Sequence, residues 1–461
     1  MIRRILIANR GEIALRVIRT CRELGIESVA VYAQADSESL HVSMADKAMC
    51  LGRGTLAETY LDKLEIITAA KVSGADAIHP GYGFLSESSE FAKMVDDYGI
   101  TFIGPSHGTI SRMGDKIAAL NTALSAGVPV IPGSLGAVES DKLVMEIAEE
   151  IGFPIIIKAA AGGGGKGMRI VREKFQLEES LHSARSEARN FFGNDSVYVE
   201  RYIEAGRHVE VQVLADNYGN ALALGERDCS IQRRHQKLVE ESPAPFLPEE
   251  VRAEMFEAAV RLARETQYTG VGTIEFIVDE KNRFFFIEMN TRIQVEHPVT
   301  ELCTDIDLIK YQILTASGEK LPFTQDQITH EGHSIECRIN AENPQNNFIP
   351  SPGKITHLVL PGGPGVRVDS HIYAGYKIPH QYDSLIAKII VHAPNRPEAI
   401  ARMRRALSEF QVEGIETTIP LHKKIMNNEV FNGGKYNTGF IVEESILDQG
   451  VREKIVYERT I

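Results

Sequence analysis

The sequence predicts a multidomain α/β protein in which a doubly wound N-terminal domain precedes two α+β regions. In the first hundred residues, short apolar runs alternate with amphipathic stretches, which is typical of strand–helix–strand units. Beyond Pro132 the pattern changes to hairpin-like strands separated by helices, and a third region, punctuated by Pro and Gly, begins after about residue 330. A chain of 461 residues is long enough for about three domains.

The N-terminal region predicts a parallel sheet with helices on both faces. Strands are expected at "RRILIAN", "ESVAVYA", "GADAIHP" and "ITFIGP", and a helix is expected from Gly11 to Gly25. The turn after the first strand, Asn9 to Gly11, holds a single glycine, whereas a dinucleotide-binding turn needs the G-x-G-x-x-G pattern. The sequence therefore argues against a nicotinamide-binding domain.

The second and third regions mix strands with helices. A helix from about Gly114 to Gly127 carries Asp115 and Lys116, and further helices are expected at about 141–151, 176–190 and 249–266. Strands are expected near Lys158, His208, Ala223, Glu275 and Glu288. The third region begins at "HSIECRINAENP" and continues to the strand "SLIAKIIVHA" and the helix "RPEAIARMRRALSEF".

Composition and charge exclude several classes of protein. Lys and Arg number 50 against 63 Asp and Glu, a formal net charge of −13, which argues against a general nucleic-acid or anionic-membrane binder. We find no uncharged apolar run of the roughly 18 residues that a membrane span needs, and no signal peptide. The five cysteines show neither CxxC nor zinc-ligand spacing, so we expect reduced thiols in a cytoplasmic protein.

Four consecutive glycines lie between two predicted strands in "IIIKAAAGGGGKGMRIV", residues 155–171. Glycine lets backbone N–H groups wrap phosphate oxygens, and Lys158, Lys166 and Arg169 lie close by in the sequence. A Walker A loop is excluded because Gly167 and a β pattern follow Lys166. The segment therefore predicts a phosphate-binding lid, and a flexible hairpin tip is the alternative.

Two weaker patterns precede the strongest one. In "RHVEVQVLA", period two places His208, Glu210 and Gln212 on one face, which is most often a solvent-facing pattern. The stretch "ERDCSIQRRHQK", residues 226–237, concentrates basic side chains in an acidic protein. We expect these side chains on one loop, where they would suit an anionic substrate, with a solvated loop as the alternative.

The strongest pattern is a predicted hairpin in "GTIEFIVDEKNRFFFIEMNTRIQVEH". A four-residue loop near Lys281 and Asn282 would set Glu275 directly opposite Glu288. Two carboxylates at that spacing repel each other unless a cation lies between them, and carboxylates together with triphosphate oxygens describe a Mg²⁺–ATP site. The intervening apolar side chains are predicted to need a core behind them: Phe285, Ile287, Met289 and Ile293.

Continuing the strand would add further polar side chains to the carboxylate face: Asn290, Arg292, Gln294 and Glu296. The last three would suit a small anion held beside a base.

These segments, in this order, resemble biotin carboxylase, a member of the ATP-grasp superfamily. The resemblance extends over about residues 1–446 and includes "IANRGEIALRVIR", "HPGYGFLSE", "FIEMNTRIQVEHPVTE", "IECRINAE" and "YDSLIAKIIV". It implies an N-terminal α/β domain at 1–113, an ATP-grasp core at 114–330 with a mobile glycine-rich lid at about 132–204, a C-terminal domain at 331–446, and a tail at 447–461.

The resemblance also implies an ATP site with Mg²⁺ or Mn²⁺. Phosphate contacts are implied for Lys116, Lys158, His235 and the lid glycines Gly163, Gly164 and Gly165. Adenine would lie against Glu200, Arg201 and Ile203, and the ribose against His208 and Gln232. The metal ligands would be Glu275, Glu288 and Asn290.

For the chemistry, the resemblance implies that bicarbonate binds Lys237, Arg292, Gln294 and the backbone of Val295. Glu296 would be the general base. Arg338 would stabilise the biotin enolate, with Tyr82 close to the biotin ring.

The expected partners follow from the same resemblance and from one negative observation. Carrier domains of this system hold biotin on the lysine of a Met-Lys-Met-like turn, and none of the eleven methionines here is followed by lysine. We therefore expect a separate biotin carboxyl carrier protein and a separate carboxyltransferase. The resemblance alone implies a homodimer, and for a free-standing chain of this size an acetyl-CoA carboxylase is the first expectation. A two-subunit pyruvate carboxylase, another acyl-CoA carboxylase and, further off, another ATP-grasp ligase remain open.

Overall fold

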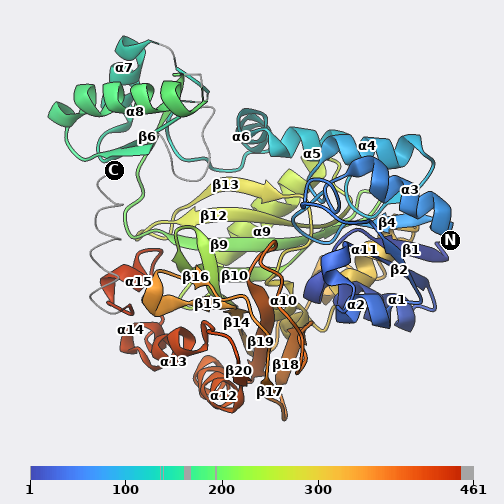
Figure 1. Ribbon diagram of the computed structural model, residues 1–461. Helices are drawn as coiled ribbons and strands as arrows, with labels where there is room; N and C mark the ends of the chain where they lie inside the picture. Colours follow the sequence, from blue (N-terminus) through green and yellow to red (C-terminus); the bar gives the residue numbers. More distant parts are fainter. Residues whose placement is uncertain (1, 135, 139, 160–167, 193–194, 448–461) are drawn as a thin grey trace.

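The computed structural model describes residues 2–134, 136–138, 140–159, 168–192 and 195–447. A small parallel sheet and a long antiparallel sheet lie side by side, and a lobe built on a three-stranded sheet projects from them (Figure 1). Among the described residues, no helix is both long and apolar enough to cross a membrane. The lid glycines 163–165 and the tail beyond Leu447 lie outside the described residues.

The N-terminal sheet is parallel, as the sequence predicts, with strand order β3-β2-β1-β4-β5. Period two along β1 divides its side chains: Ile5 and Ile7 join one buried cluster, and Leu6 joins another on the opposite face. This doubly wound arrangement confirms the predicted fold class. The strands are β1 Arg4–Ile7, β2 Glu27–Tyr32, β3 Lys47–Cys50, β4 Ala77–His79 and β5 Thr101–Phe102. The helices are α1 Gly11–Glu23, α2 Leu40–Met44, α3 Lys63–Ser73, α4 Ser89–Asp97 and α5 His107–Gly114.

The helix predicted from Gly114 to Gly127 begins later than expected. α5 ends at Gly114, and α6 (Lys116–Ser125) begins after Asp115, whose carboxylate caps it by accepting from the backbone N–H of Ala118 at 2.8 Å.

The projecting lobe has its own small core. Its three-stranded sheet, of order β7-β6-β8, packs against α7 and α8. These elements are α7 Asp141–Ile151, β6 Ile155–Ala159, β7 Met168–Val171, α8 Leu177–Phe192 and β8 Val197–Arg201.

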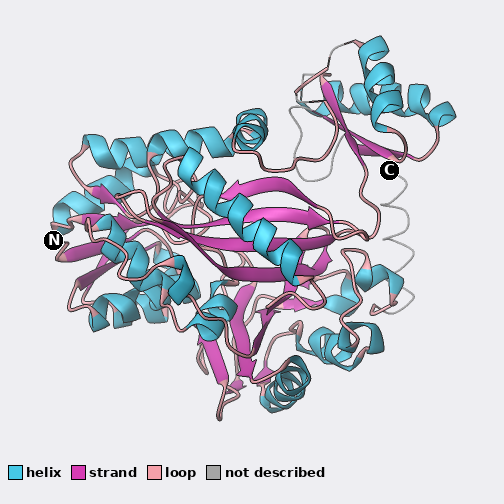
Figure 2. Cartoon of the chain, turned by 180° about the vertical axis from the view of Figure 1, so that it is seen from behind, coloured by secondary structure: helices cyan, strands magenta, loops and turns pink. Residues whose placement is uncertain are grey.

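One antiparallel sheet of eight strands, of order β13-β12-β9-β10-β11-β14-β19-β18, joins the middle and C-terminal regions of the chain. The pairing of β11 with β14 carries the sheet across the predicted boundary at residue 330. Helices lie over the sheet, as seen from behind in Figure 2. The strands are β9 Arg207–Ala215, β10 Ala221–Arg233, β11 Gln236–Ser242, β12 Gly270–Val278, β13 Phe284–Asn290, β14 His333–Asn340, β18 Val366–Ser370 and β19 Leu385–Ala393. The helices of these regions are α9 Glu249–Glu265, α10 His297–Thr304, α11 Leu308–Ala316, α12 Arg396–Glu409, α13 Ile419–Asn427, α14 Glu429–Asn432 and α15 Phe440–Glu443.

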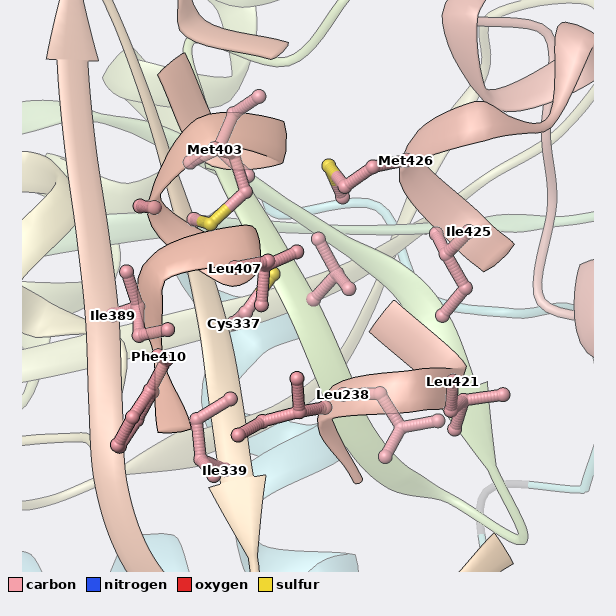
Figure 3. Packing of buried hydrophobic residues seen from close by; sticks show 14 of the residues in the cluster. Leu238, Cys337, Ile339, Ile389, Met403, Leu407, Phe410, Leu421, Ile425 and Met426 are labelled. Atoms are coloured by element: carbon pink, nitrogen blue, oxygen red, sulfur yellow. The ribbon is translucent and has the colours of Figure 1, made fainter. Parts of the chain in front are cut away.

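The C-terminal end of this sheet has two unlike faces. Cys337 and Ile339 of β14 and Ile389 of β19 pack against α12 and α13, as Figure 3 shows. Because side chains alternate along a strand, Glu336, Arg338 and Lys388 lie on the other face, together with Glu240 and Asp369 from the flanking strands. α10 contacts β11, β14 and β19. The charged face is thus where the site is built.

Candidate active site

Three carboxylates face one another across adjacent strands. Glu275 of β12 pairs directly with Glu288 of β13, as predicted, and with Glu210 of β9 on its other side. The reason for the first pairing differs from the prediction. The loop between the strands spans five residues, 279–283, and a bulge at Ile287 restores the register. The bulge also alters the alternation, so Ile287 is 38% exposed and Phe286 joins the core instead. The prediction of a core behind Phe285 and Ile287 is wrong, whereas the same prediction for Met289 and Ile293 is confirmed, since both are buried.

Lys237 lies at the centre of the carboxylates. Its Nζ donates to Glu210 Oε2 at 2.6 Å, to Glu275 Oε1 at 2.9 Å and to Glu296 Oε1 at 2.8 Å. Burial opposes its charge, but the three carboxylates raise the pKa of Lys237 well above its usual value. The ammonium therefore stays charged and offsets the repulsion between the acids.

Glu296 is held between two cations from different parts of the chain. Its Oε1 accepts from Lys237, and its Oε2 accepts from Arg338 Nη2 at 2.9 Å. Burial disfavours its ionised form, but Lys237, Arg338 and Arg227 hold the pKa of Glu296 well below its usual range. Arg338 also donates from Nε to Glu240 Oε1 at 2.6 Å. A buried, ionised carboxylate thus lies between an ammonium and a guanidinium.

The predicted strand does not continue through Arg292, Gln294 and Glu296. β13 ends at Asn290, and Glu296 lies at the start of α10. The side chains nevertheless converge, because the loop returns them to the carboxylates. Asn290 Nδ2 and Gln294 Nε2 each donate to Glu275 Oε1 at 2.8 Å, and Arg292 Nη2 donates to Asn290 Oδ1 at 2.9 Å.

The donor set for a divalent metal ion is oxygen-rich. Glu288 is exposed, and no donor from the described part of the chain hydrogen-bonds its carboxylate. Partial desolvation and the neighbouring Glu275 raise the pKa of Glu288. Two opposed carboxylates and the amide oxygen of Asn290 fit Mg²⁺ or Mn²⁺, which prefer such ligands. A second group of possible ligand atoms, from His208, Glu210 and Glu275, lies within 4.8 Å of one another. Lys237 already forms ion pairs with both carboxylates of that group.

The basic stretch 226–237 is a hairpin and not the expected loop. β10 and β11 meet at a two-residue turn, Arg234 and His235, with φ of 49° and 64°. The side chains diverge: Arg233 packs over the ring of Phe348, while Lys237 enters the carboxylate cluster. Gln232 lies directly across the hairpin from Lys237.

The residues expected around the nucleotide lie on the projecting lobe and on the long sheet. Lys158 forms an ion pair with Glu200, a residue that the resemblance assigns to adenine and not to phosphate. His208 Nε2 lies 2.8 Å from Glu275 Oε2. Burial, with the charges of His208 and Lys158, lowers the pKa of His235, so the lobe and the sheet act on one side chain.

Three expected nucleotide residues lie apart from these contacts. Lys116 is exposed at the start of α6, Arg201 donates to the carbonyl of Ile151 at 3.1 Å, and Ile203 follows β8 beside Gly206. The expected contacts of Gly163, Gly164 and Gly165 lie outside the described residues.

Tyr82 borders a small hollow that is also lined by Arg10, Glu12, His371 and Asp383. Its hydroxyl donates to Glu12 Oε1. Burial and nearby acids raise the pKa of Tyr82, and Arg338 opposes that rise, so the two residues expected at biotin lie within electrostatic range of each other.

Several residues of the site are missing from the sequence-based set. Arg227, fully buried, binds Glu210, Gln212 and Gln294. Glu240 binds Arg338, and Lys388 donates to the carbonyl oxygen of Val295 at 2.7 Å. The sequence indicates these residues only as charged side chains within strands that are otherwise rich in apolar residues. Such side chains are rarely buried without a partner.

Comparisons with known proteins bear on the whole chain. Family models match for "Biotin carboxylase, N-terminal domain" at residues 1–110, "Carbamoyl-phosphate synthase L chain, ATP binding domain" at 115–324 and "Biotin carboxylase C-terminal domain" at 336–443. Biotin carboxylase 1 of Bacillus subtilis is 57% identical over 448 residues, which cover 97% of this chain and 100% of that protein.

Two solved structures are similar throughout. The biotin carboxylase domain dimer of 2-oxoglutarate carboxylase from Hydrogenobacter thermophilus, in complex with MgADP, ADP and bicarbonate, has a TM-score of 0.90 at 48% identity. A biotin carboxylase subunit of pyruvate carboxylase has a TM-score of 0.86 at 47% identity. Each match covers 97% of this chain and 99% of the other.

Proposed function

This chain belongs to the biotin carboxylase family of ATP-dependent ligases, and we propose that it carboxylates N1 of biotin on a separate carrier protein as the first half-reaction of an acetyl-CoA carboxylase. The match to the entire length of a Bacillus subtilis biotin carboxylase supports the proposed half-reaction. We further propose a cytoplasmic homodimer that acts with a carrier protein and a carboxyltransferase. Pyruvate carboxylase and 2-oxoglutarate carboxylase are the competing contexts, because similar chains occur in both.

The observation that carries the proposed chemistry is Glu296 between Lys237 and Arg338. Bicarbonate is a poor nucleophile until it loses its proton. In our proposal Lys237, Arg292, Gln294 and the backbone of Val295 hold the anion beside Glu296, which takes that proton. The bicarbonate oxygen then attacks the γ-phosphorus of ATP, the bond to the β-phosphate oxygen breaks, and carboxyphosphate and ADP form.

The second step uses the other cation. Carboxyphosphate releases CO₂ and phosphate, the phosphate takes the proton from N1 of biotin, and N1 attacks CO₂. Negative charge develops on the ureido oxygen, and Arg338 is the fixed cation proposed to stabilise it. Tyr82 would lie against the biotin ring.

ATP would be held by the phosphate contacts proposed for Lys116, Lys158, His235 and the lid glycines, with Glu200, Arg201 and Ile203 at adenine and His208 and Gln232 at the ribose. Glu275, Glu288 and Asn290 would hold Mg²⁺ or Mn²⁺, which supplies charge stabilisation for the phosphoryl group. Closure of the lid over the nucleotide would exclude water that could hydrolyse the intermediate.

The deciding experiment is ATP hydrolysis by the purified chain with Mg²⁺, measured with and without bicarbonate and free biotin. We expect turnover that requires bicarbonate and rises with biotin. Turnover indifferent to both would refute the proposal and indicate another ATP-grasp ligase.

An Arg338→Ala variant separates the two steps. It should retain bicarbonate-dependent ATP cleavage better than biotin carboxylation, because Arg338 is proposed to act on the enolate. Equal loss of both activities would contradict that role.

A further inference from the structure

Lys388 of β19 is a fully buried lysine on which three regions of the chain converge. Its Nζ donates to the carbonyl oxygen of Val295, from the loop before α10, at 2.7 Å. It lies 3.2 Å from Glu12 Oε1 of α1 and 3.9 Å from Asp369 Oδ2 of β18. The side chain is 0% exposed. A buried ammonium is costly unless it is paired, so these contacts are what keep it in place.

The loop between β13 and α10 depends on such support. Residues 291–296 belong to no strand, so no ladder of backbone hydrogen bonds sets the orientation of their peptide groups. Lys388 Nζ donates a hydrogen bond to one of these peptide groups, the carbonyl of Val295. A substrate site built on a loop is precise only where groups behind it hold its backbone.

The Lys388 ammonium is also connected to Tyr82, through Glu12. Glu12 Oε1 accepts from the hydroxyl of Tyr82 and forms an ion pair with Lys388 Nζ, while Glu12 Oε2 has no hydrogen-bond partner in the described structure. The unbroken series is the Val295 carbonyl, Lys388, Glu12 and the Tyr82 hydroxyl. It joins the middle, C-terminal and N-terminal regions of the chain.

We propose that Lys388 is a positioning residue, and that the series Val295–Lys388–Glu12–Tyr82 couples the geometry of the bicarbonate loop to the side chain at the biotin ring. This inference rests on the proposed function, which assigns Val295 to bicarbonate and Tyr82 to biotin. The Tyr82 hydroxyl and the Lys388 ammonium contact the same carboxylate oxygen, so the loss of either contact changes the strength of the other. Tyr82, at the proposed biotin site, then influences the binding of bicarbonate without contacting the anion.

The test is a Tyr82→Phe variant assayed by bicarbonate-dependent ATP cleavage without biotin. Loss of the hydroxyl leaves Glu12 to pair with Lys388 alone, which draws the ammonium from the carbonyl of Val295. The KM for bicarbonate should rise about threefold or more, the range expected for contacting groups in one network. Tyr373→Phe is the matched control, since the Tyr373 hydroxyl donates to the carbonyl of Glu38 and lies outside the series; it should match the wild type.

A Lys388→Met variant completes the test. Its KM for bicarbonate should also rise, and adding Tyr82→Phe to it should produce no further increase, because the series is already cut. If Lys388→Met does not fold, the comparison of Tyr82→Phe with Tyr373→Phe decides by itself.

The outcomes separate this inference from the proposed function. Wild-type turnover that ignores bicarbonate refutes the proposed function. Bicarbonate-dependent wild-type turnover with an unchanged KM for bicarbonate in Tyr82→Phe refutes the coupling and leaves the proposed function standing.

Discussion

Glu296 keeps its charge in a buried position because two cations contact it. Burial by itself would favour the neutral acid, but Lys237, Arg338 and Arg227 hold its pKa well below the usual range. A carboxylate so stabilised is a weak base. We expect bicarbonate to compete for the ammonium of Lys237, which would make Glu296 more basic once its substrate has bound.

At the residue scale, removal of Arg338 should change the pH profile of ATP cleavage. Burial persists and one neighbouring cation is lost, so the pKa of Glu296 rises, and activity falls on the acid side at a higher pH than in the wild type. The acid limb of kcat/KM for bicarbonate, corrected for the bicarbonate present at each pH, should move up by about 1 pH unit or more in Arg338→Ala.

Glu240→Gln is the control for that profile. It alters the other partner of Arg338 but leaves both contacts of Glu296 in place, so its acid limb should not move upward. Superimposable profiles for Arg338→Ala and the wild type would contradict the role of Arg338 in holding Glu296 ionised.

At the scale of elements, two local irregularities place the site. The bulge at Ile287 brings Glu288 opposite Glu275. The tight turn at Arg234 and His235 reverses β10 into β11 and sends Lys237 inward. Such two-residue turns require positive φ, usually supplied by Asn-Gly, so the Arg-His sequence gives no turn signal. Strained backbone of this kind is characteristic of functional sites.

A separate ionic network fastens β11 to the C-terminal helices. Arg396 Nε donates to Glu241 Oε2 at 2.7 Å, and Arg396 Nη2 donates to Glu241 Oε1 at 3.0 Å. His333 and Tyr436 contact the same carboxylate. Although burial opposes ionisation, His333 and Arg396 lower the pKa of Glu241 to about 2.

The contribution of Glu241 to the free energy of unfolding should therefore decrease as the pH falls. The folded-state pKa of Glu241 is about 2, against 4.5 for an ordinary glutamate. Ionised Glu241 therefore stabilises the fold above pH 4.5, and this stabilisation is lost as the pH falls toward 2. In urea unfolding, the gap in unfolding free energy between the wild type and Glu241→Gln should narrow on acidification, by up to about 3 kcal/mol. Arg396→Met should show the same narrowing, and a constant gap would contradict the ion-pair assignment.

At the scale of the whole molecule, the site exists only where separate regions meet. The long sheet brings β14 and β19 beside β11, so Arg338 and Lys388 reach the loop before α10. α1 of the N-terminal domain adds Glu12. Three regions that look independent in the sequence are therefore parts of one site.

The whole chain should act on biotin without carrying it. Because none of its eleven methionines precedes a lysine, we expect the chain purified from biotin-supplied cells to have its unmodified mass and to be invisible to streptavidin. A biotinylated carrier protein treated in the same way is the positive control. A mass increase of one biotinyl group on this chain would contradict the separate-carrier proposal.

The sequence by itself determined most of the order of strands and helices and the doubly wound N-terminal sheet. It also indicated the pairing of Glu275 with Glu288, although the bulge at Ile287 sets that register. Periodicity and turn spacing are local properties, so residues close in the chain suffice to indicate them. It also pointed to Asn290, Arg292, Gln294 and Glu296, although by extending a strand that ends at Asn290.

Only the tertiary structure decided which charges are buried together. Glu210 appears in the sequence as part of a solvent face, and Arg227 as part of a basic loop, yet both are fully buried against each other. For Lys388 the only local signal is a charge inside an apolar strand, and it does not identify the partners Val295 and Glu12, which are distant in sequence. A buried charge is tolerable only where opposite charges from other elements converge on it, and that convergence is a property of the assembled fold.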